Sequence, residues 1–341
     1  MKAVVVRTSG ELALETVPDP TPEPGQMVLR VRACGICGSD LHLHQAAALG
    51  AGAVMGHEFC GEVMESAGGF RAGERVCSLP VLSCGSCQRC RSGLGAFCST
   101  GTPLGLGAQP GAFAEYVAVV PHQAVRLPAG VDDALGALVE PLAVGLHAVN
   151  VARVRRGESC LVIGAGPIGL AIAMWARTFG AGEVVVSEGV AVRRDLAERI
   201  GATAVIDPAT ESLPEAVARQ FPEGPDVVFE AVGLPGLIQR AIDVVRFRGR
   251  VVVAGACLGP DTIQPIPTMI KEASLHFVLA YEKDDFQYAV DMLDDGRISP
   301  GVMITDRIGL EDVPGAFKAL ENPEGHCKVI AFPSMGLGDD E

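Results

Sequence analysis

The stretch SCLVIGAGPIGLAIAMWARTFGAGEVVVSE, residues 159–188, decides the fold. An apolar run ends at Ile163, a glycine-rich turn follows, and an apolar segment of helix length comes directly after the turn. A second apolar run ends just before Glu188. Strand, glycine turn and helix in this order are typical of a dinucleotide-binding parallel sheet. The glycines in mid-stretch and the charge of Arg177 argue against a membrane span.

The glycine-rich turn is placed to bind a phosphate. Backbone N–H groups at the start of a helix favour negative charge, and glycine lets the backbone approach a pyrophosphate closely. We expect cofactor contacts from Gly164, Gly166, Pro167, Ile168 and Gly169. Glu188 is expected to accept hydrogen bonds from the adenosine ribose, which favours NAD over NADP. We also expect Arg193 to contact the cofactor. NADP remains the alternative cofactor, because Arg193 and Arg194 could bind a 2′-phosphate if their loop bent back.

Short apolar runs continue outward from this turn. In the C-terminal half they lie at 161–163, 184–187, 204–206, 227–230 and 251–254, separated by segments of helix length. This alternation is typical of a parallel, doubly wound sheet. The first third of the chain carries strand-like runs at 3–7, 27–33 and 61–65, with glycine and proline between them. That spacing predicts an antiparallel, barrel-like module.

Helical patterns connect these parts. Leucines at three- and four-residue steps between 132 and 156 predict one or two bridging helices. A later helix is expected with Asp284 as N-cap and Gly296 after its end. The segment 301–332 again has strand character. We therefore expect an α/β protein with a catalytic domain at 1–145, a dinucleotide-binding domain at 146–284 and a return to the catalytic domain at 285–341.

Four cysteines stand close together in the run CGSCQRCRSGLGAFC, residues 84–98. The spacing C-x2-C-x2-C-x7-C lets one loop wrap four thiolates around one ion and close a tetrahedral zinc site. We expect a structural zinc bound by Cys84, Cys87, Cys90 and Cys98. An iron–sulfur cluster is the alternative, although ferredoxin runs place the fourth cysteine after three residues and before a proline. Unliganded thiols are the remaining possibility.

A second metal site is predicted from scattered residues. Cys37, the pair His57-Glu58 and Glu140 offer a thiolate, an imidazole and carboxylates. Three such ligands leave a fourth position open on zinc, which catalysis requires. Cys34 competes with Cys37, but a polar Gly-Ser-Asp turn follows Cys37 directly.

Composition narrows the partners and the compartment. The net charge of −14 argues against a nucleic-acid partner, because phosphate binding depends on lysine and arginine. Eleven cysteines and a start without the features of a signal peptide indicate a reducing compartment. We expect a cytoplasmic protein with a small-molecule substrate, no disulfides and no membrane partner.

Seven segments resemble the zinc-containing medium-chain alcohol dehydrogenases, most closely their polyol, butanediol and threonine dehydrogenase branch. They are CGICGSDLH at 34–42, GHEFCGEV at 56–63, the four-cysteine run, GAFAEYV at 111–117, EPLAVGLHAV at 140–149, GAGPIG at 164–169 and FEAVG at 229–233. The resemblance implies a Rossmann domain beside a β-rich, GroES-like catalytic domain that carries the structural zinc lobe.

The resemblance also implies roles around the catalytic zinc. The ligands would be Cys37, His57 and Glu140, with Glu58 as an exchangeable or substitute ligand. Asp40 would accept the other ring N–H of His57 and fix its tautomer. The proton would leave through a relay formed by Ser39 and His42.

Further roles concern the cofactor. The nicotinamide and its ribose would lie against Val232, Gly233, Ala254, Gly255 and Ala256. Lys328 would approach the pyrophosphate.

The implied activity is reversible oxidation of a secondary hydroxyl in a small diol, polyol or related alcohol. One of two zinc ions would hold the alkoxide while hydride passes to NAD. The alternatives are an NADP-linked carbonyl reductase on the same scaffold and a non-catalytic, zinc-stabilised nucleotide-binding protein. A homo-oligomer, dimer or tetramer, is expected by analogy. The segment 45–55 departs from the family pattern and leaves one wall of the substrate site undefined.

Overall fold

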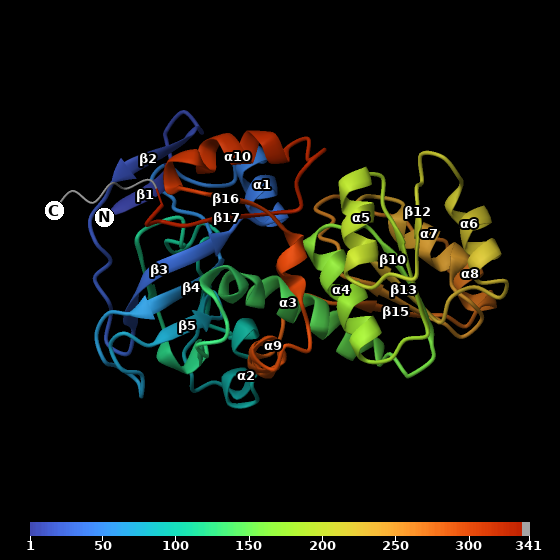
Figure 1. The fold of residues 1–341 in the computed structure, drawn as a ribbon, viewed down its shortest axis with the longest axis horizontal. Helices are drawn as coiled ribbons and strands as arrows, with labels where there is room; N and C mark the ends of the chain where they lie inside the picture. The colour runs from blue at the N-terminus through green and yellow to red at the C-terminus, as the bar shows by residue number, and fades with distance from the viewer. Residues whose placement is uncertain (336–341) are drawn as a thin grey trace. The chain divides into compact units, whose positions relative to one another are not determined.

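The computed structural model describes residues 1–335, and the chain divides into two compact units (Figure 1). Unit 1 comprises Met1–Glu140, Tyr281–Arg297 and the chain from Ile304 onward. Unit 2 comprises Pro141–Ala280 and Ile298–Met303. The units therefore change at Glu140 and Tyr281 rather than at the expected 145 and 284. Ile298–Met303 belongs to unit 2 and not to the return segment.

Unit 2 is built on a six-stranded sheet with the strand order β12-β11-β10-β13-β14-β15, parallel throughout. Its strands are β10 (Ser159–Ile163), β11 (Glu183–Ser187), β12 (Ala204–Ile206), β13 (Val227–Glu230), β14 (Arg250–Val253) and β15 (Ser274–Phe277). The first strand of this sheet is β10, and β11 and β12 are added in turn on one side of it. The chain then crosses to the other side of β10, where β13 pairs with it. The carboxyl ends of β10 and β13 therefore form a topological switch point, where doubly wound sheets bind ligands.

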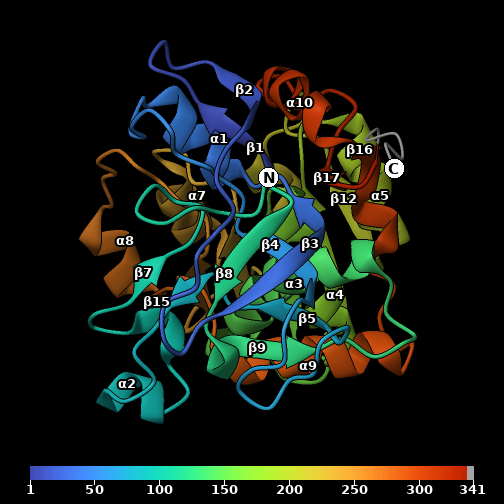
Figure 2. The same cartoon turned by 90° about the vertical axis from the view of Figure 1, so that its left-hand side faces the viewer.

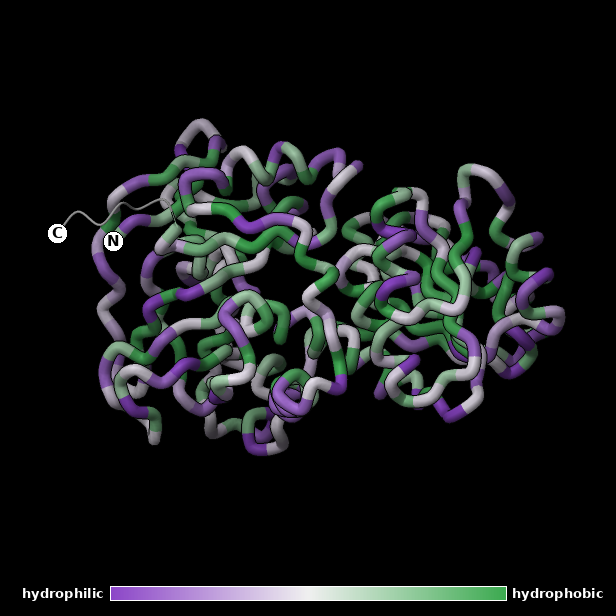
Figure 3. Tube along the Cα trace, in the orientation of Figure 1, coloured by the Kyte–Doolittle hydropathy of each residue, from purple (hydrophilic) through white to green (hydrophobic). Residues whose placement is uncertain are grey.

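Helices connect these strands. They are α4 (Pro167–Thr178), α5 (Ala191–Arg199), α6 (Leu213–Gln220), α7 (Leu237–Val244) and α8 (Pro265–Ile270). The short 3-10 helix η3 (Pro300–Met303) also belongs to unit 2 but lies after the last strand of its sheet. The inner strands β10, β11, β13 and β14 are almost entirely buried, and apolar segments gather in this unit in Figure 3. Trp175 of α4 is fully buried and donates its indole N–H to the carbonyl oxygen of Leu142 at 2.9 Å. The expected parallel, doubly wound sheet is confirmed.

Unit 1 is built on a largely antiparallel sheet, of which Figure 2 shows β3, β4, β5, β8 and β9. The strand order is β16-β17-β3-β4-β5-β9, and β8 pairs with β3. These strands are β3 (Met27–Gly35), β4 (Glu58–Val63), β5 (Arg75–Ser78), β8 (Tyr116–Val119), β9 (Ala124–Arg126), β16 (Ile304–Ile308) and β17 (Lys328–Ala331). Strands from the C-terminal segment thus complete a sheet that begins near the N-terminus.

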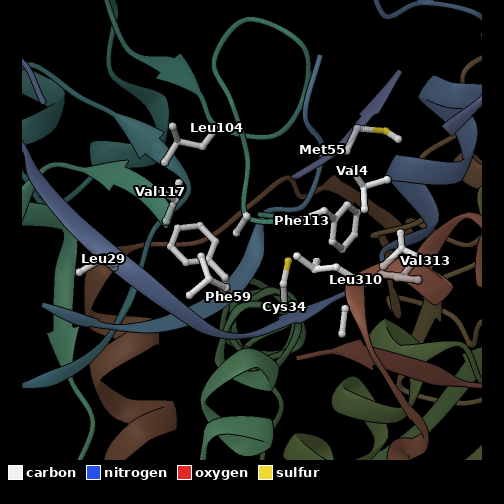
Figure 4. Close-up of a cluster of buried hydrophobic side chains, with 14 of the residues drawn as sticks. Val4, Leu29, Cys34, Met55, Phe59, Leu104, Phe113, Val117, Leu310 and Val313 are labelled. Carbon is white, nitrogen blue, oxygen red and sulfur yellow. The ribbon is translucent and has the colours of Figure 1, made fainter. Parts of the chain in front are cut away.

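Smaller elements surround this sheet. Two-stranded sheets pair β1 (Lys2–Val6) with β2 (Leu12–Thr16), and β6 (Val81–Leu82) with β7 (Thr102–Pro103). The helices of unit 1 are α1 (Gly38–Gln45), α2 (Gln88–Arg91), α9 (Lys283–Asp294) and α10 (Val313–Leu320), with the 3-10 helices η1 (Gly95–Phe97), η2 (Pro121–Gln123) and η4 (Leu310–Asp312). Leu29, Phe59, Phe113 and Val313 form part of the core (Figure 4).

One helix, α3 (Asp133–Ala152), occupies the segment in which one or two helices were expected. It is long and apolar enough to cross a membrane, but 72% of its apolar window is buried inside the protein, as in a core helix. Helix α9 begins two residues earlier than expected, because Glu282 and not Asp284 is its N-cap. Asp285 accepts a hydrogen bond from the Glu282 N–H at 2.8 Å, which completes a capping box.

Candidate functional site

Cys37, His57 and Glu58 form a metal-binding cluster in unit 1. Their ligand atoms all lie within 4.8 Å of one another. Cys37 is the N-cap of α1, and Glu58 is the first residue of β4 and directly follows His57. A thiolate, an imidazole and a carboxylate are ligands typical of zinc. The cluster is largely buried, with exposed fractions of 5% for His57 and 1% for Glu58.

Ser39 and Asp40 hold the cluster from the first turn of α1. The Ser39 hydroxyl lies 3.2 Å from the Cys37 sulfur and 3.3 Å from His57 Nε2. Asp40 is fully buried, and its Oδ1 lies 3.3 Å from His57 Nδ1. Neither of these two atoms has another hydrogen-bond partner in the part of the chain that the structure describes. The Asp40 carboxylate therefore faces one nitrogen of the ring and leaves the other directed toward Cys37.

The electrostatics of His57 bear on metal binding. Burial opposes protonation of the ring, but the charges of Asp40 and Cys37 outweigh it and raise the pKa of His57 well above its ordinary value. Both nitrogens of a protonated imidazole carry a proton and have no free lone pair for a metal, so metal binding at Nε2 must release a proton.

Glu140 lies close to the cluster, although it is not within the 4.8 Å set. Burial raises the pKa of Glu140 to about 7, with His57 opposing the rise and Glu58 adding to it. The Tyr281 hydroxyl donates a hydrogen bond to the Glu140 carboxylate, and Tyr281 is only 3% exposed. Sequence analysis missed Tyr281, since only the fold brings the segment before α9 next to residue 140.

Lys328 is buried beside the metal-binding cluster. Its ammonium group is buried in unit 1 and donates to Glu58 Oε1 at 2.7 Å and to the Ile36 carbonyl oxygen at 3.0 Å. A buried ammonium needs a carboxylate and further acceptors to offset its desolvation. The expected contact of Lys328 with the pyrophosphate stays a prediction. Within unit 1, Lys328 fixes the Glu58 side chain.

Cys34 and His42 also flank the cluster. Cys34 lies in the apolar core of Figure 4, and burial raises the pKa of its thiol well above the ordinary value, so it is poorly suited as a ligand. His42 lies on α1 three residues after Ser39 and is exposed. No hydrogen bond joins the side chains of Ser39 and His42 within residues 1–335. A proton relay through both would need a water or ligand group between them.

The four-cysteine run folds into a compact lobe. Its sulfurs are 3.4 Å apart for Cys87–Cys90, 3.6 Å for Cys84–Cys98, 3.9 Å for Cys87–Cys98 and 4.0 Å for Cys84–Cys90. A tetrahedron with zinc–sulfur bonds of about 2.3 Å places its sulfurs about 3.8 Å apart. The lobe therefore fits a zinc ion with four thiolate ligands.

Backbone N–H groups favour thiolates in the lobe. Hydrogen bonds from the N–H groups of Ser86 and Cys87 lower the pKa of Cys84 to about 5. Those of Cys90 and Ser99 lower the pKa of Cys87 to about 7. Zinc binds the thiolate form, so these hydrogen bonds prepare the lobe for the metal.

The glycine-rich turn of unit 2 fits a phosphate group. Helix α4 begins at Pro167 with Gly166 as N-cap, and no side chain caps its N-terminus. The first N–H groups of the helix therefore remain available to an anion. Ile168 and Gly169 lie in this first turn of α4. A Cβ atom at Gly166 would meet nothing within 4 Å, which leaves room for a ligand. A Cβ at Gly169 would lie 1.9 Å from the Gly164 carbonyl oxygen, so glycine there is required by packing.

Glu188 lies beside this turn, as expected. Its Oε2 accepts the Ala165 N–H at 2.7 Å and its Oε1 accepts the Val190 N–H at 2.8 Å. Arg194 donates to the carbonyl oxygens of Glu188 and Gly189 and pairs with Asp207 at 2.9 Å. Arg193 is half-buried on α5. The guanidinium of Arg194 is thus already engaged by unit 2 itself.

Two loops follow β13 and β14. Val232 and Gly233 stand in the first, and Ala254, Gly255 and Ala256 stand in the second. They meet closely, since a Cβ at Gly233 would lie 2.7 Å from the Ala256 backbone. The loops lie at the carboxyl ends of the strands on one side of the switch point, and Glu188 lies on the other.

Comparisons with known proteins agree with this geometry. Residues 23–129 match the alcohol dehydrogenase GroES-like domain, and residues 167–295 match the zinc-binding dehydrogenase domain. The chain is 34% identical over 91% of its length to 2-dehydro-3-deoxy-L-galactonate 5-dehydrogenase of Pseudoalteromonas atlantica, of which it covers 92%. It is 30% identical over 98% of its length to (R,R)-butanediol dehydrogenase of Bacillus subtilis, of which it covers 100%. The chain belongs to the zinc-containing medium-chain alcohol dehydrogenases.

Solved structures of this family carry the same fold. A zinc-binding dehydrogenase from Sinorhizobium meliloti bound to NADP has a TM-score of 0.88 and 33% identity, with 97% of this chain and 99% of that chain covered. An alcohol dehydrogenase from Escherichia coli complexed with NADH has a TM-score of 0.89 and 28% identity over the same shares. The expected GroES-like and Rossmann architecture is confirmed, and the protein is an oxidoreductase of a family that uses zinc and a nicotinamide cofactor.

The lobe predicts the outcome of Cys87→Ser. The variant should lose about one zinc ion per chain and melt at a lower temperature, because three thiolates cannot close the tetrahedron. Zinc content by mass spectrometry and thermal unfolding measure this. Cys257→Ser, which changes a cysteine outside both clusters, is the control and should keep the parent zinc content. A Cys87→Ser protein with the zinc content and melting temperature of the parent contradicts the assignment.

The glycine-rich turn predicts opposite outcomes for two matched variants. Gly166→Ala should keep the parent melting temperature but weaken cofactor binding by about tenfold or more, because its methyl group enters the space left for the pyrophosphate. Gly169→Ala should lower the melting temperature, because its Cβ collides with the Gly164 carbonyl oxygen. Thermal unfolding and titration with NADH separate the two effects. Equal melting temperatures for both variants would show that the turn is not packed as described.

Proposed function

We propose that the protein is a zinc- and NAD-dependent dehydrogenase that oxidises a secondary hydroxyl of a small diol, polyol or related alcohol, reversibly. The observation that carries the proposal is the buried cluster of Cys37, His57 and Glu58 with Ser39 between two of its donor atoms. Relatives such as (R,R)-butanediol dehydrogenase support a secondary alcohol as substrate. A catalytic zinc and a structural zinc in the lobe make two ions per chain in this proposal.

The donor set of the cluster suits a catalytic zinc. Cys37, His57 and a carboxylate from Glu58 or Glu140 would hold it, and Lys328 would set which carboxylate is free to bind, since it already binds Glu58. When bound, zinc supplies Lewis-acid polarisation of the substrate hydroxyl, and NAD accepts the hydride.

The protein's own residues position the reaction. Asp40 faces His57 Nδ1 and so orients the ring with Nε2 toward Cys37. Ser39 lies within hydrogen-bond distance of both donor atoms, so its hydroxyl is placed to take the proton of a substrate hydroxyl. His42, three residues further on α1 and exposed, is placed to pass that proton to solvent through a bridging group.

NAD is the cofactor we propose. The Glu188 carboxylate stands at the turn, where the 2′-phosphate of NADP would meet its negative charge. Arg194 is held by two carbonyl oxygens and Asp207, which leaves it poorly placed to bind a phosphate. The NADP-bound neighbour favours the second candidate, an NADP-linked carbonyl reductase on the same scaffold. The carboxylate at position 188 is the observation that supports NAD in this proposal.

A second copy of this chain is the partner we propose, in a reducing, cytoplasmic setting. Strand β15 is an edge of the sheet of unit 2, so one side of its backbone has no strand partner. Phe277 and Leu279 in or just after it are exposed by 70% and 73%, and Ile270 of α8 by 72%. Exposed apolar groups beside an open strand edge support a homo-oligomer.

The cluster predicts the outcome of Ser39→Ala. The variant should retain zinc and cofactor but lose about 10²- to 10⁴-fold in kcat on secondary alcohols, because the first proton acceptor is gone. His42→Ala should act more mildly and alter mainly the pH–rate profile, since water can replace a group at the end of a relay. NADH formation with a panel of diols, polyols, amino alcohols and aromatic alcohols, beside zinc content, provides the measurement. Parent turnover and pH profile in Ser39→Ala would exclude the relay, and no activity of the parent on any alcohol would exclude the proposed function.

Glu188 predicts a change of cofactor preference. Glu188→Ser removes the charge that opposes a 2′-phosphate, so kcat/KM for NADP should rise relative to NAD. Steady-state kinetics with both cofactors measures the ratio. Glu183→Ser, at the exposed start of β11, the strand that Glu188 follows, is the matched control and should leave the ratio unchanged. A parent enzyme that already prefers NADP contradicts the choice of NAD.

A further inference from the structure

Glu230 is a buried acid without a cationic partner. It is the last residue of β13, is 1% exposed, and stands opposite Ile163 of β10 in the parallel register. Within residues 1–335 no ion pair to Glu230 is formed, and it is the one buried acid of unit 2. A buried carboxylate is costly unless hydrogen bonds or a positive charge compensate it. Its position at the switch point of the sheet suggests that it serves the bound cofactor.

Glu230 ties the two loops beyond β13 and β14 together. Its carboxylate Oε1 accepts the N–H groups of Val232 and Gly233, both at 2.8 Å. Its backbone carbonyl oxygen accepts the N–H groups of Ala254 and Gly255, at 2.8 and 2.9 Å. Hydrogen bonds to an ionised acceptor are roughly twice as strong as neutral ones. One residue therefore determines the conformation of both loops.

The loops approach each other so closely that only glycine fits. A Cβ at Gly255 would lie 2.2 Å from the Gly233 nitrogen and 2.6 Å from Glu230 Oε2. Gly233 has a φ of +80°, which side chains rarely adopt. Val232 and Leu234 of the first loop are exposed by 39% and 60%. Glu230 Oε2 thus lies beside Gly255, where the two loops meet. The first loop presents the apolar side chains of Val232 and Leu234 to solvent.

The order of the strands indicates which part of the cofactor reaches these loops. Glu188 follows β11 on one side of β10, and the phosphate-binding turn follows β10 itself. A dinucleotide that lies across the carboxyl ends of the strands extends from there over β13 and β14. The end opposite the adenosine is the nicotinamide, whose ring is positively charged when oxidised and neutral when reduced.

We propose that Glu230 is a positioning residue for the nicotinamide end of the cofactor, and that its buried negative charge favours the oxidised ring over the reduced one. The inference rests on the proposed dinucleotide function. The hydrogen bonds to Val232 and Gly233 set the shape of the loop, and the charge acts on the ring through a poorly screened, largely buried region. Favouring the oxidised ring would strengthen binding of the cofactor form that accepts hydride from an alcohol.

The test compares the binding of three ligands to the holoenzyme by titration calorimetry: NAD, NADH and ADP-ribose, which lacks the nicotinamide. Glu230→Gln keeps the size of the side chain and an oxygen for the two N–H groups but removes the charge. We expect the ratio of the Kd for NAD to the Kd for NADH to rise about tenfold, with the Kd for ADP-ribose unchanged within about twofold. Glu158→Gln, which removes a carboxylate paired with Arg250 in the same unit, is the control and should leave all three constants near those of the parent.

Glu230→Asp is the second variant and keeps the proposal testable if the Gln variant does not fold. It preserves the charge but shortens the side chain, so both nicotinamide forms should bind more weakly at the parent ratio. A changed ratio in Glu230→Asp, or equal weakening of NAD and NADH in Glu230→Gln, contradicts the role of the charge. If the Kd for ADP-ribose rose in Glu230→Gln as much as those for NAD and NADH, Glu230 would only maintain the fold and the proposal would be wrong. A parent that binds none of the three ligands would refute the dinucleotide function itself.

Discussion

The buried ion pair between Lys328 and Glu58 is the interaction on which unit 1 depends. The two residues are 270 positions apart, both are 1% exposed, and the Lys328 ammonium also binds the Ile36 carbonyl oxygen. Removing one partner of a buried pair costs about 3–5 kcal/mol, because an uncompensated charge remains in the interior. The pairing of the C-terminal strand β17 with β3 thus brings Lys328 to the metal cluster.

The same pair shows why the cluster suits a cation. Glu58, Glu140, Asp40 and Cys37 bring acidic groups into one buried region, and burial raises the pKa of Glu140 to about 7. Lys328 offsets part of this charge. The donor atoms of Cys37, His57 and Glu58 within 4.8 Å of one another match what a zinc ion needs to offset the rest. The desolvation of these groups is thus the physical reason why a metal ion would be stabilised at this position.

Unit 2 depends on a different constraint, the close approach of backbone to backbone. Gly169 contacts the Gly164 carbonyl oxygen, and Gly255 contacts the Gly233 nitrogen, at distances that exclude any side chain. These contacts occur at the carboxyl ends of neighbouring strands, where the acidic residues Glu188 and Glu230 hold the loops through their N–H groups. A surface made of N–H groups and glycine suits a flat, phosphate-bearing ligand.

Local patterns in the sequence determined the parallel sheet, the glycine-rich turn with Glu188, and the four-cysteine lobe. Each depends on residues within about thirty positions, where periodicity and ligand spacing follow directly from backbone geometry. The grouping of Cys37, Ser39 and Asp40 could also be predicted from the sequence, because they lie at the start of one helix. Only the tertiary structure decided the partner of Lys328, the hydrogen bond from Tyr281 to Glu140 and the assignment of Cys34 to the core. The Lys328–Glu58 contact joins residues 270 positions apart and is set by how strands β3, β4 and β17 pair. The Tyr281–Glu140 contact joins the segment before α9 to α3, and no local spacing records either contact.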